Sequence, residues 1–219
     1  MFNKLSEFLR YLASRQKGDD ESMPALDQLS ADLKINRAAL REQVAVARAL
    51  GLVSVKPRVG MRRLTYTFTP ALQQSLGYAI LEDRTNFEKY SDLRAHVESA
   101  YFHQAVEKLK PEDIEELKEL IKKAWGKLRD TPAKIPHQEH RYLHILMYKR
   151  LDNIFVTGIL EAYWEAYEAI ELNTFTDYAY LTEVWNYHTR IVEAIECEEY
   201  NEAHQILLDH TKLIAVRPN

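Results

Sequence analysis

The chain has 219 residues and a net charge of −4, and its 46% hydrophobic and 28% charged residues are typical of globular proteins. No apolar run approaches the roughly 20 residues that a membrane-spanning helix requires, which excludes a spanning protein. A single cysteine, Cys197, excludes an internal disulfide framework and favours the reducing cytoplasm.

Three helices are predicted in the N-terminal part of the chain. Apolar residues at helical spacing predict a helix over residues 5–12 and another over residues 26–33. Asn36 is a good N-cap for a third helix, which begins at Arg37 and ends before Gly51. Only three residues separate the second and third helices, and this spacing is typical of a helix-turn-helix.

The apolar residues change from helical to alternating spacing after Gly51. The segment LVSVKP, residues 52–57, predicts a strand, residues 58–61 predict a turn, and residues 62–68 predict a second alternating strand. A helix-turn-helix followed by a basic β-hairpin is a winged helix. We therefore expect a winged helix-turn-helix DNA-binding domain over residues 1–69.

Basic residues of this region point to double-stranded DNA as the partner. Residues 1–70 hold 12 Lys and Arg against 7 Asp and Glu, whereas residues 71–219 hold 17 against 26. The start of the second helix of a helix-turn-helix enters the major groove, where arginine can bind guanine or phosphate. Cations on the hairpin suit phosphate or minor-groove contact. A solvated basic surface is the alternative. The residues expected to contact DNA are Asn36, Arg37, Arg41, Lys56, Arg58, Gly60, Arg62 and Arg63.

The segment from Met23 to Arg63 resembles the N-terminal domain of GntR-family transcription regulators. That family has a Pro-led helix, a pattern like S-R-x-x-V-R-E, then G-L-V and a wing of the P-R-x-G type. The usual Ser and Thr-Pro of the family are here Asn36 and Ala38-Ala39, which preserves the cap but changes which bases are read. The matching residues are Pro24, Leu29, Leu33, Arg37, Arg41, Glu42, Gly51, Leu52, Val53, Pro57, Arg58 and Gly60.

The rest of the chain, residues 70–219, contains no further convincing strand. Its apolar spacing and its breaks predict only helices, and we expect an all-helical effector-binding and dimerisation domain. The fold class is therefore mainly α, with an N-terminal winged helix-turn-helix and a C-terminal antiparallel helical bundle. The predicted helices cover residues 70–83, 86–108, 111–128, 134–150, 153–172, 176–197 and 200–213.

Histidines are concentrated in HQEHRYLH, residues 137–144. His140 and His144 are four residues apart on one face of a predicted helix, where they can share a metal ion. Zinc normally takes three or four protein ligands, so the pair needs partners, for which His188 and His210 are candidates. A polar histidine pair on a solvated helix is the alternative explanation.

Residues 90–213 resemble the FCD ligand-binding domain of the FadR-type branch of GntR regulators. Many FCD domains bind a metal through D-x-x-x-H on one helix and one histidine on each of two later helices. The resemblance assigns three of these positions to His144, His188 and His210, and it puts His140 where the family carries aspartate. Imidazoles suit Zn²⁺ or Ni²⁺, and losing the carboxylate raises the charge of the filled site by one, which favours an anionic co-ligand.

The segment LRAHVESAY resembles the R-x-x-x-E segment of the same family. Arg94 and Glu98 are four residues apart on a predicted helix. Arg94 either forms a salt bridge with Glu98 or faces the cavity and binds the carboxylate of an effector. Both interpretations stay open at this point.

These features together predict a homodimeric transcription regulator in the cytoplasm. We expect a ligand-responsive repressor that binds an operator and takes a small organic acid as effector, and we expect no enzyme activity or membrane association. A metal-dependent helical enzyme is one alternative, but the chain has no H-E-x-x-H and Glu139 points elsewhere than His140. A DNA-binding dimer without metal or effector is the other.

Overall fold

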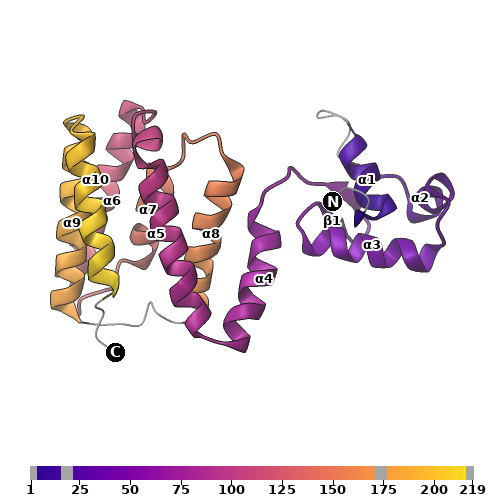
Figure 1. The fold of residues 1–219 in the computed structure, drawn as a ribbon, viewed down its shortest axis with the longest axis horizontal. Helices are drawn as coiled ribbons and strands as arrows, with labels where there is room; N and C mark the ends of the chain where they lie inside the picture. The colour runs from indigo at the N-terminus through magenta and orange to yellow at the C-terminus, as the bar shows by residue number, and fades with distance from the viewer. Residues whose placement is uncertain (1–3, 16–21, 171–176, 216–219) are drawn as a thin grey trace. The chain divides into compact units, whose positions relative to one another are not determined.

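The computed structural model describes residues 4–15, 22–170 and 177–215, and it confirms the mainly α fold class. The chain forms two compact units, Met1–Ser75 and Leu76–Asn219. Figure 1 follows the helices in chain order. The elements of the described residues are α1 (Glu7–Ser14), α2 (Leu26–Leu33), α3 (Arg37–Ala49), β1 (Val53–Lys56), β2 (Gly60–Arg63), α4 (Thr69–Glu82), α5 (Thr85–Val106), α6 (Pro111–Arg129), α7 (His137–Met147), α8 (Ile154–Ala169), α9 (Tyr178–Glu196) and α10 (Tyr200–Ala215).

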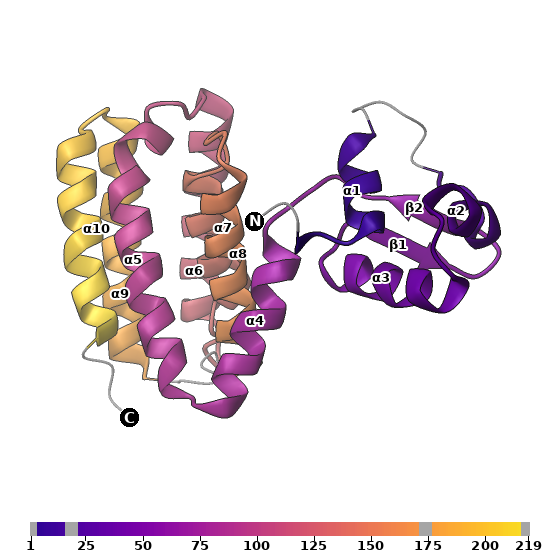
Figure 2. The ribbon, with the colours of Figure 1, turned by 45° about the vertical axis from the view of Figure 1, so that its right-hand side comes forward.

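The first unit is a helix-turn-helix with a small apolar core. Helices α1 and α2 both pack on α3, and Figure 2 shows the two-stranded hairpin that follows α3. The turn before α3 places Lys34 in the left-handed conformation at φ 54°. The side chain of Asn36 accepts a hydrogen bond of 2.8 Å from the amide of Ala39, so the predicted N-cap of α3 is confirmed. The buried core residues are Phe8, Leu12, Met23, Leu29, Leu40, Ala47, Val53 and Met61.

The second strand of the hairpin differs from the prediction. We predicted a turn over residues 58–61 and a strand over residues 62–68, but β2 begins at Gly60 and ends after four residues. Strand β1 also has only four residues, so β2 has no partner beyond its own fourth residue. The amide of Leu64 makes the last bond of the ladder, and residues 64–67 are exposed. The alternation of apolar residues in this segment therefore does not mark the buried face of a strand.

Gly51 permits the turn between α3 and β1. Its φ is +71°, which lies in the left-handed region that side chains disfavour. A Cβ atom at this position would lie 2.5 Å from Cγ of Pro70. Both the backbone conformation and the proline ring therefore require glycine here.

Six helices of the second unit form a closed ring. Helix α5 packs against α10 and α8, α10 against α9, α9 against α6, α6 against α7, and α7 against α8. Figures 1 and 2 show these helices as one bundle. The ring surrounds a large core that includes the fully buried side chains of Phe102, Leu143, Tyr148 and Trp185. Several buried polar residues, among them Arg94, Glu98 and His144, come from the same helices.

Two helix boundaries in this bundle depend on single residues. Asn153 caps α8, and the chain between α9 and α10 turns at Glu198, whose φ is 60°. The left-handed conformation of Glu198 explains why α9 ends and α10 begins in a segment that contains no glycine or proline. The predicted end of one helix at residue 172 and the predicted start of the next helix at residue 176 lie outside the described residues. No described helix is long and apolar enough to cross a membrane.

The start of α6 is tied to the turn after α7 by a buried carboxylate. Asp113 is 0% exposed, and its carboxylate accepts a hydrogen bond of 3.0 Å from the backbone amide of Lys110. Arg150 binds the same carboxylate with two nitrogens, at 2.7 and 3.1 Å. These bonds hold the pKa of Asp113 far below its usual value, so the carboxylate stays charged.

Candidate metal centre and nucleic-acid interface

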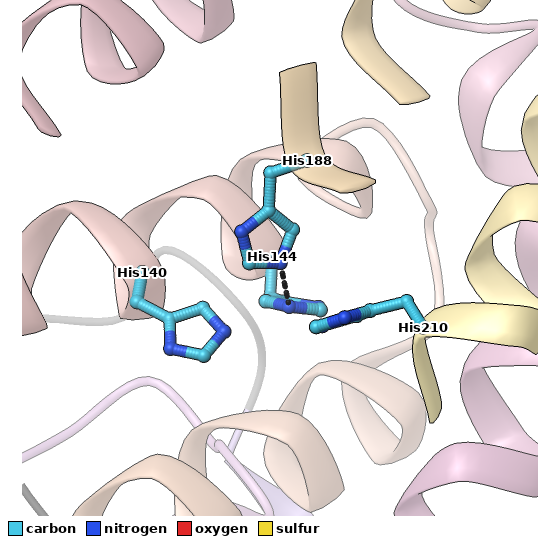
Figure 3. A group of neighbouring side chains, drawn as sticks. All are labelled: His140, His144, His188 and His210. Atoms are coloured by element: carbon cyan, nitrogen blue, oxygen red, sulfur yellow. Dashed lines mark hydrogen bonds between the residues drawn. The ribbon is translucent and has the colours of Figure 1, made fainter. Parts of the chain in front are cut away.

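Four histidines from three helices meet inside the helical bundle. His140 and His144 come from α7, His188 from α9 and His210 from α10. One ring nitrogen of each lies within 4.8 Å of one ring nitrogen of every other. Figure 3 shows His140 and His210 approaching from opposite sides, with His188 pointing towards His144 between them. The structure therefore brings together all four residues that the sequence singled out as metal ligands.

One pair of these nitrogens already has the spacing of two ligands of one ion. Nε2 of His144 and Nε2 of His188 are 3.2 Å apart. Two nitrogens that bind a tetrahedral zinc ion at about 2.0–2.1 Å stand about 3.3–3.4 Å from each other. The longest separation in the cluster, up to 4.8 Å, would have to shorten by roughly 1.5 Å for four-coordinate binding.

Burial keeps these imidazoles in the form that binds metals. His144, His188 and His210 are 0% exposed, and His140 is partly buried. Desolvation lowers the pKa of all four below the usual value. Neighbouring histidines add to the lowering at His140, His188 and His210, Arg94 adds to it at all four, and the pKa of His210 falls to about 3. Neutral imidazole is the metal-binding form, so the cluster is ready to coordinate at physiological pH.

Several buried ring nitrogens of the cluster have no hydrogen-bond partner within the described part of the chain. They are Nε2 of His140, Nδ1 of His188, and both nitrogens of His210. Buried polar atoms are normally hydrogen-bonded, and leaving one without a partner costs about 1–3 kcal/mol. A metal ion would satisfy the nitrogens that face the cluster, so these residues fit a metal.

Arg94 and Glu98 of α5 lie beside the cluster as a buried ion pair. A terminal guanidinium nitrogen of Arg94 is 3.0 Å from Oε2 of Glu98, and the two side chains are 1% and 0% exposed. Glu98 Oε1 lies 3.1 Å from Nδ1 of His144, and Arg94 lies 2.9 Å from the same nitrogen. Burial raises the pKa of Glu98, while Arg94 opposes that shift. Sequence reasoning offered the salt bridge but missed the contact of both residues with His144.

Aromatic rings pack against Arg94 and against the histidine cluster. The guanidinium of Arg94 lies over the rings of Tyr163 and Trp164, at 4.6 and 5.5 Å from their centroids. The indole of Trp164 packs edge-on against His140, with 4.7 Å between ring centroids. Its Nε1 is buried without a hydrogen-bond partner in the described residues. Nothing in the spacing of these aromatic residues along the sequence marks Trp164 as a neighbour of the histidines.

The predicted DNA-contacting residues of α3 are exposed. Arg37 and Arg41 project one turn apart at the start of the helix, next to the capping Asn36. Arg37 also forms a salt bridge with Asp27 of α2, which sequence reasoning did not find. This contact links the first arginine of α3 to the preceding helix.

The predicted cations of the hairpin fall into two environments. Lys56, Arg58 and Arg62 are exposed, and the exposed Gly60 has a φ of +87° that allows the tight turn. Arg63 is partly buried, and its guanidinium donates a hydrogen bond of 3.0 Å to the carbonyl of Arg15. Arg63 therefore also ties the hairpin to the end of α1.

Comparison with known proteins gives a family for most of the second unit and a similar fold for almost the whole chain. Residues 90–213, more than half of the chain, match the FCD domain family. A comparison with curated proteins gives no match. The fold is similar to that of Streptococcus agalactiae GntR, with a TM-score of 0.69 and 16% identity over 94% of each chain. E. coli McbR/YncC gives a TM-score of 0.52 and 18% identity over 98% of this chain and 93% of that chain. Lar, which controls the expression of the Listeria monocytogenes agr system, gives 0.51 and 13% over 96% of each.

Proposed function

Because the chain belongs to the FCD-domain family of GntR transcription regulators, we propose that it is a ligand-responsive repressor with a metal-dependent effector site. The members of this family are regulators rather than enzymes. The observation that carries the proposal is the convergence of four buried histidines inside the helical bundle. The alternative of a metal-dependent enzyme is set aside by the family match.

The DNA-binding part of the proposal assigns residues 1–69 to operator recognition. Helix α3 would enter the major groove with Arg37 and Arg41 towards the bases, and the exposed cations of the hairpin would contact the backbone. Two copies of the chain would form a homodimer and read a palindromic site, with recognition helices about one DNA turn apart. This binding would take place in the cytoplasm and weaken as salt rises.

The effector part of the proposal assigns residues 70–219 to metal and ligand binding. The four histidines would hold one Zn²⁺ or Ni²⁺ ion, and the ion would supply a Lewis-acidic position for a carboxylate oxygen. All four proposed ligands are neutral, and the charge of Arg94 is balanced by Glu98. The loaded site would thus keep the full positive charge of the ion, which supports an anionic effector such as a small organic acid. Arg94 would be the second group to contact it.

Effector binding would alter DNA affinity through a coupling free energy between the two sites. A ligand that binds one arrangement of the dimer more tightly shifts the population towards that arrangement. We propose that the effector favours the arrangement with lower operator affinity, as a repressor requires. The same coupling requires that operator DNA lowers the affinity for the effector by an equal factor.

Fluorescence anisotropy with DNA from upstream of the chain's own gene tests the DNA assignment. We expect Arg37→Ala and Arg41→Ala each to weaken binding by about 10- to 100-fold, because each removes a groove contact. Arg48→Ala, in the last turn of the same helix, is the matched control and should change affinity little. Equal binding by all three variants and the parent would contradict the assignment of α3.

Metal analysis of the purified protein tests the effector site separately. We expect about one equivalent of transition metal per chain, lost in a His188→Ala/His210→Ala variant. Exposed His96 provides the control, because His96→Ala should keep the metal. Equal metal content in the parent and the double variant would leave a DNA-binding dimer without metal as the better description.

A further inference from the structure

The Nδ1 atom of His144 has two buried neighbours that it cannot serve at the same time. Arg94 lies 2.9 Å away and is only a donor, so a bond with it requires a lone pair on Nδ1. Glu98 Oε1 lies 3.1 Å away and, as a carboxylate, is only an acceptor, so a bond with it requires a proton on Nδ1. A neutral imidazole carries one proton, and its position decides which neighbour is bound.

The partner that Nδ1 of His144 binds also decides whether Nε2 of the same ring, which faces the other histidines, carries a proton. If Arg94 donates to Nδ1, the proton is on Nε2 and points at Nε2 of His188, 3.2 Å away. That arrangement forms a continuous donor chain from Arg94 through His144 to His188. If Nδ1–H donates to Glu98 instead, Nε2 carries a lone pair and can bind a metal.

We propose that Arg94 and Glu98 are competing positioning residues, and that metal loading transfers the Nδ1 contact of His144 from Arg94 to Glu98. In the metal-free protein His144 accepts from Arg94 and carries its proton on Nε2. In the loaded protein it donates from Nδ1 to Glu98, and one N–H group of Arg94 is released from the imidazole. This inference rests on the proposed metal site and adds a regulatory step to it.

The other contacts of Arg94 and Glu98 favour a change of the His144 tautomer without a large movement of the side chains. Arg94 keeps its 3.0 Å ion pair with Glu98 Oε2 in both arrangements. The hydroxyl of Tyr148 donates to the backbone carbonyl of Glu98 at 2.8 Å, which holds this turn of α5 in place. The guanidinium of Arg94 also lies over the Tyr163 ring, 4.6 Å from its centroid. The N–H group of Arg94 that is released from His144 would become available to an anion bound beside the metal.

Nitrogen-15 spectra of the histidine rings, recorded on the chelator-treated and the Zn²⁺-loaded protein, test the switch. We expect the His144 ring to carry its proton on Nε2 without metal, and on Nδ1 with Nε2 bound when zinc is present. A His144→Gln variant identifies the signals. The same tautomer in both states, or zinc bound through Nδ1, would overturn the inference. Absence of zinc binding by the parent protein would overturn the proposed metal site as well, so the two failures are distinguishable.

Zinc affinity of a Glu98→Gln variant, measured by competition with a chelator, is the second test. The amide keeps the shape of the carboxylate but can donate to Nδ1 and favour the non-binding tautomer, so we expect affinity to fall about 10- to 100-fold. Glu139→Gln is the matched control, because Glu139 is 7% exposed and binds Lys127 at 2.8 Å instead of a cluster histidine. Unchanged affinity in Glu98→Gln, or an equal loss in both variants, would contradict a specific role of Glu98.

Discussion

Mild acid should destabilise the metal-free protein, because buried histidines cannot take up protons in the folded state. Burial lowers the pKa of the four cluster histidines, His140, His144, His188 and His210, below the ordinary value of 6.5, to about 3 for His210. The unfolded chain therefore binds more protons than the folded chain below pH 6.5. The stability is fully present above that value and is lost progressively as pH falls towards 3.

The size of the loss follows from the number of histidine rings whose pKa burial lowers. At a pH one unit below the unfolded pKa, each histidine that stays neutral lowers the free energy of unfolding by about 1.4 kcal/mol. The four rings of the cluster together give at most about 6 kcal/mol. Glu98 acts in the opposite direction, because its raised pKa means that the folded state takes up a proton first. We therefore expect the net loss at pH about 5.5 to be smaller than this sum but still a large share of the usual 5–15 kcal/mol.

Urea unfolding followed by circular dichroism, at several pH values and with chelator present, measures this loss. A His210→Gln variant should show a pH dependence that is shallower by about one quarter, since one of four rings is removed. Exposed His96 supplies the control, and His96→Gln should keep the parent's dependence. Stability that does not change between pH about 7.5 and 5.5, or equal slopes in the parent and His210→Gln, would refute the reasoning.

Three further predictions concern single positions. Gly51→Ala should lower the free energy of unfolding by at least about 2 kcal/mol, because of the positive φ and the nearby proline ring, whereas Gly126→Ala on the open face of α6 should be neutral or stabilising in the same urea titration. Asp113→Asn should cost about 1–3 kcal/mol, because it removes the charge of a buried carboxylate that binds the partly exposed Arg150, and Glu112→Gln at the exposed neighbour should cost less than about 1 kcal/mol; similar losses would show that burial of the Asp113 carboxylate is unimportant. His140→Asp should keep one metal ion per chain, since aspartate also ligates zinc, while His140→Leu should weaken zinc binding in a chelator competition; equal affinity in both would remove His140 from the ligand set.

Local signals predicted most of the fold. The Asn36 cap, the apolar spacing of the helices and the break before Pro111 placed the helix ends within a few residues of their observed positions. The hairpin was the exception, because the end of β2 depends on the length of the strand beside it. Pairing of this kind is a tertiary property that the alternation of one segment cannot reveal.

The candidate site could be predicted only where spacing or family resemblance pointed to it. The i,i+4 histidines and the resemblance to FCD domains led to all four members of the cluster. The contact of Glu98 with His144 joins residues 46 positions apart, and nothing in the local sequence of either residue indicates it. The salt bridge between Asp27 and Arg37 was missed for the same reason, because it depends on the packing of α2 against α3.

A crystal structure of the zinc-loaded protein, with anomalous scattering at the zinc edge, tests the central claim most directly. We predict one anomalous peak per chain, bound by ring nitrogens of His140, His144, His188 and His210, with Glu98 against Nδ1 of His144. Ligand distances should be about 2.0–2.1 Å. A peak held by other residues, or no peak at the four histidines in a protein saturated with zinc, would contradict the account.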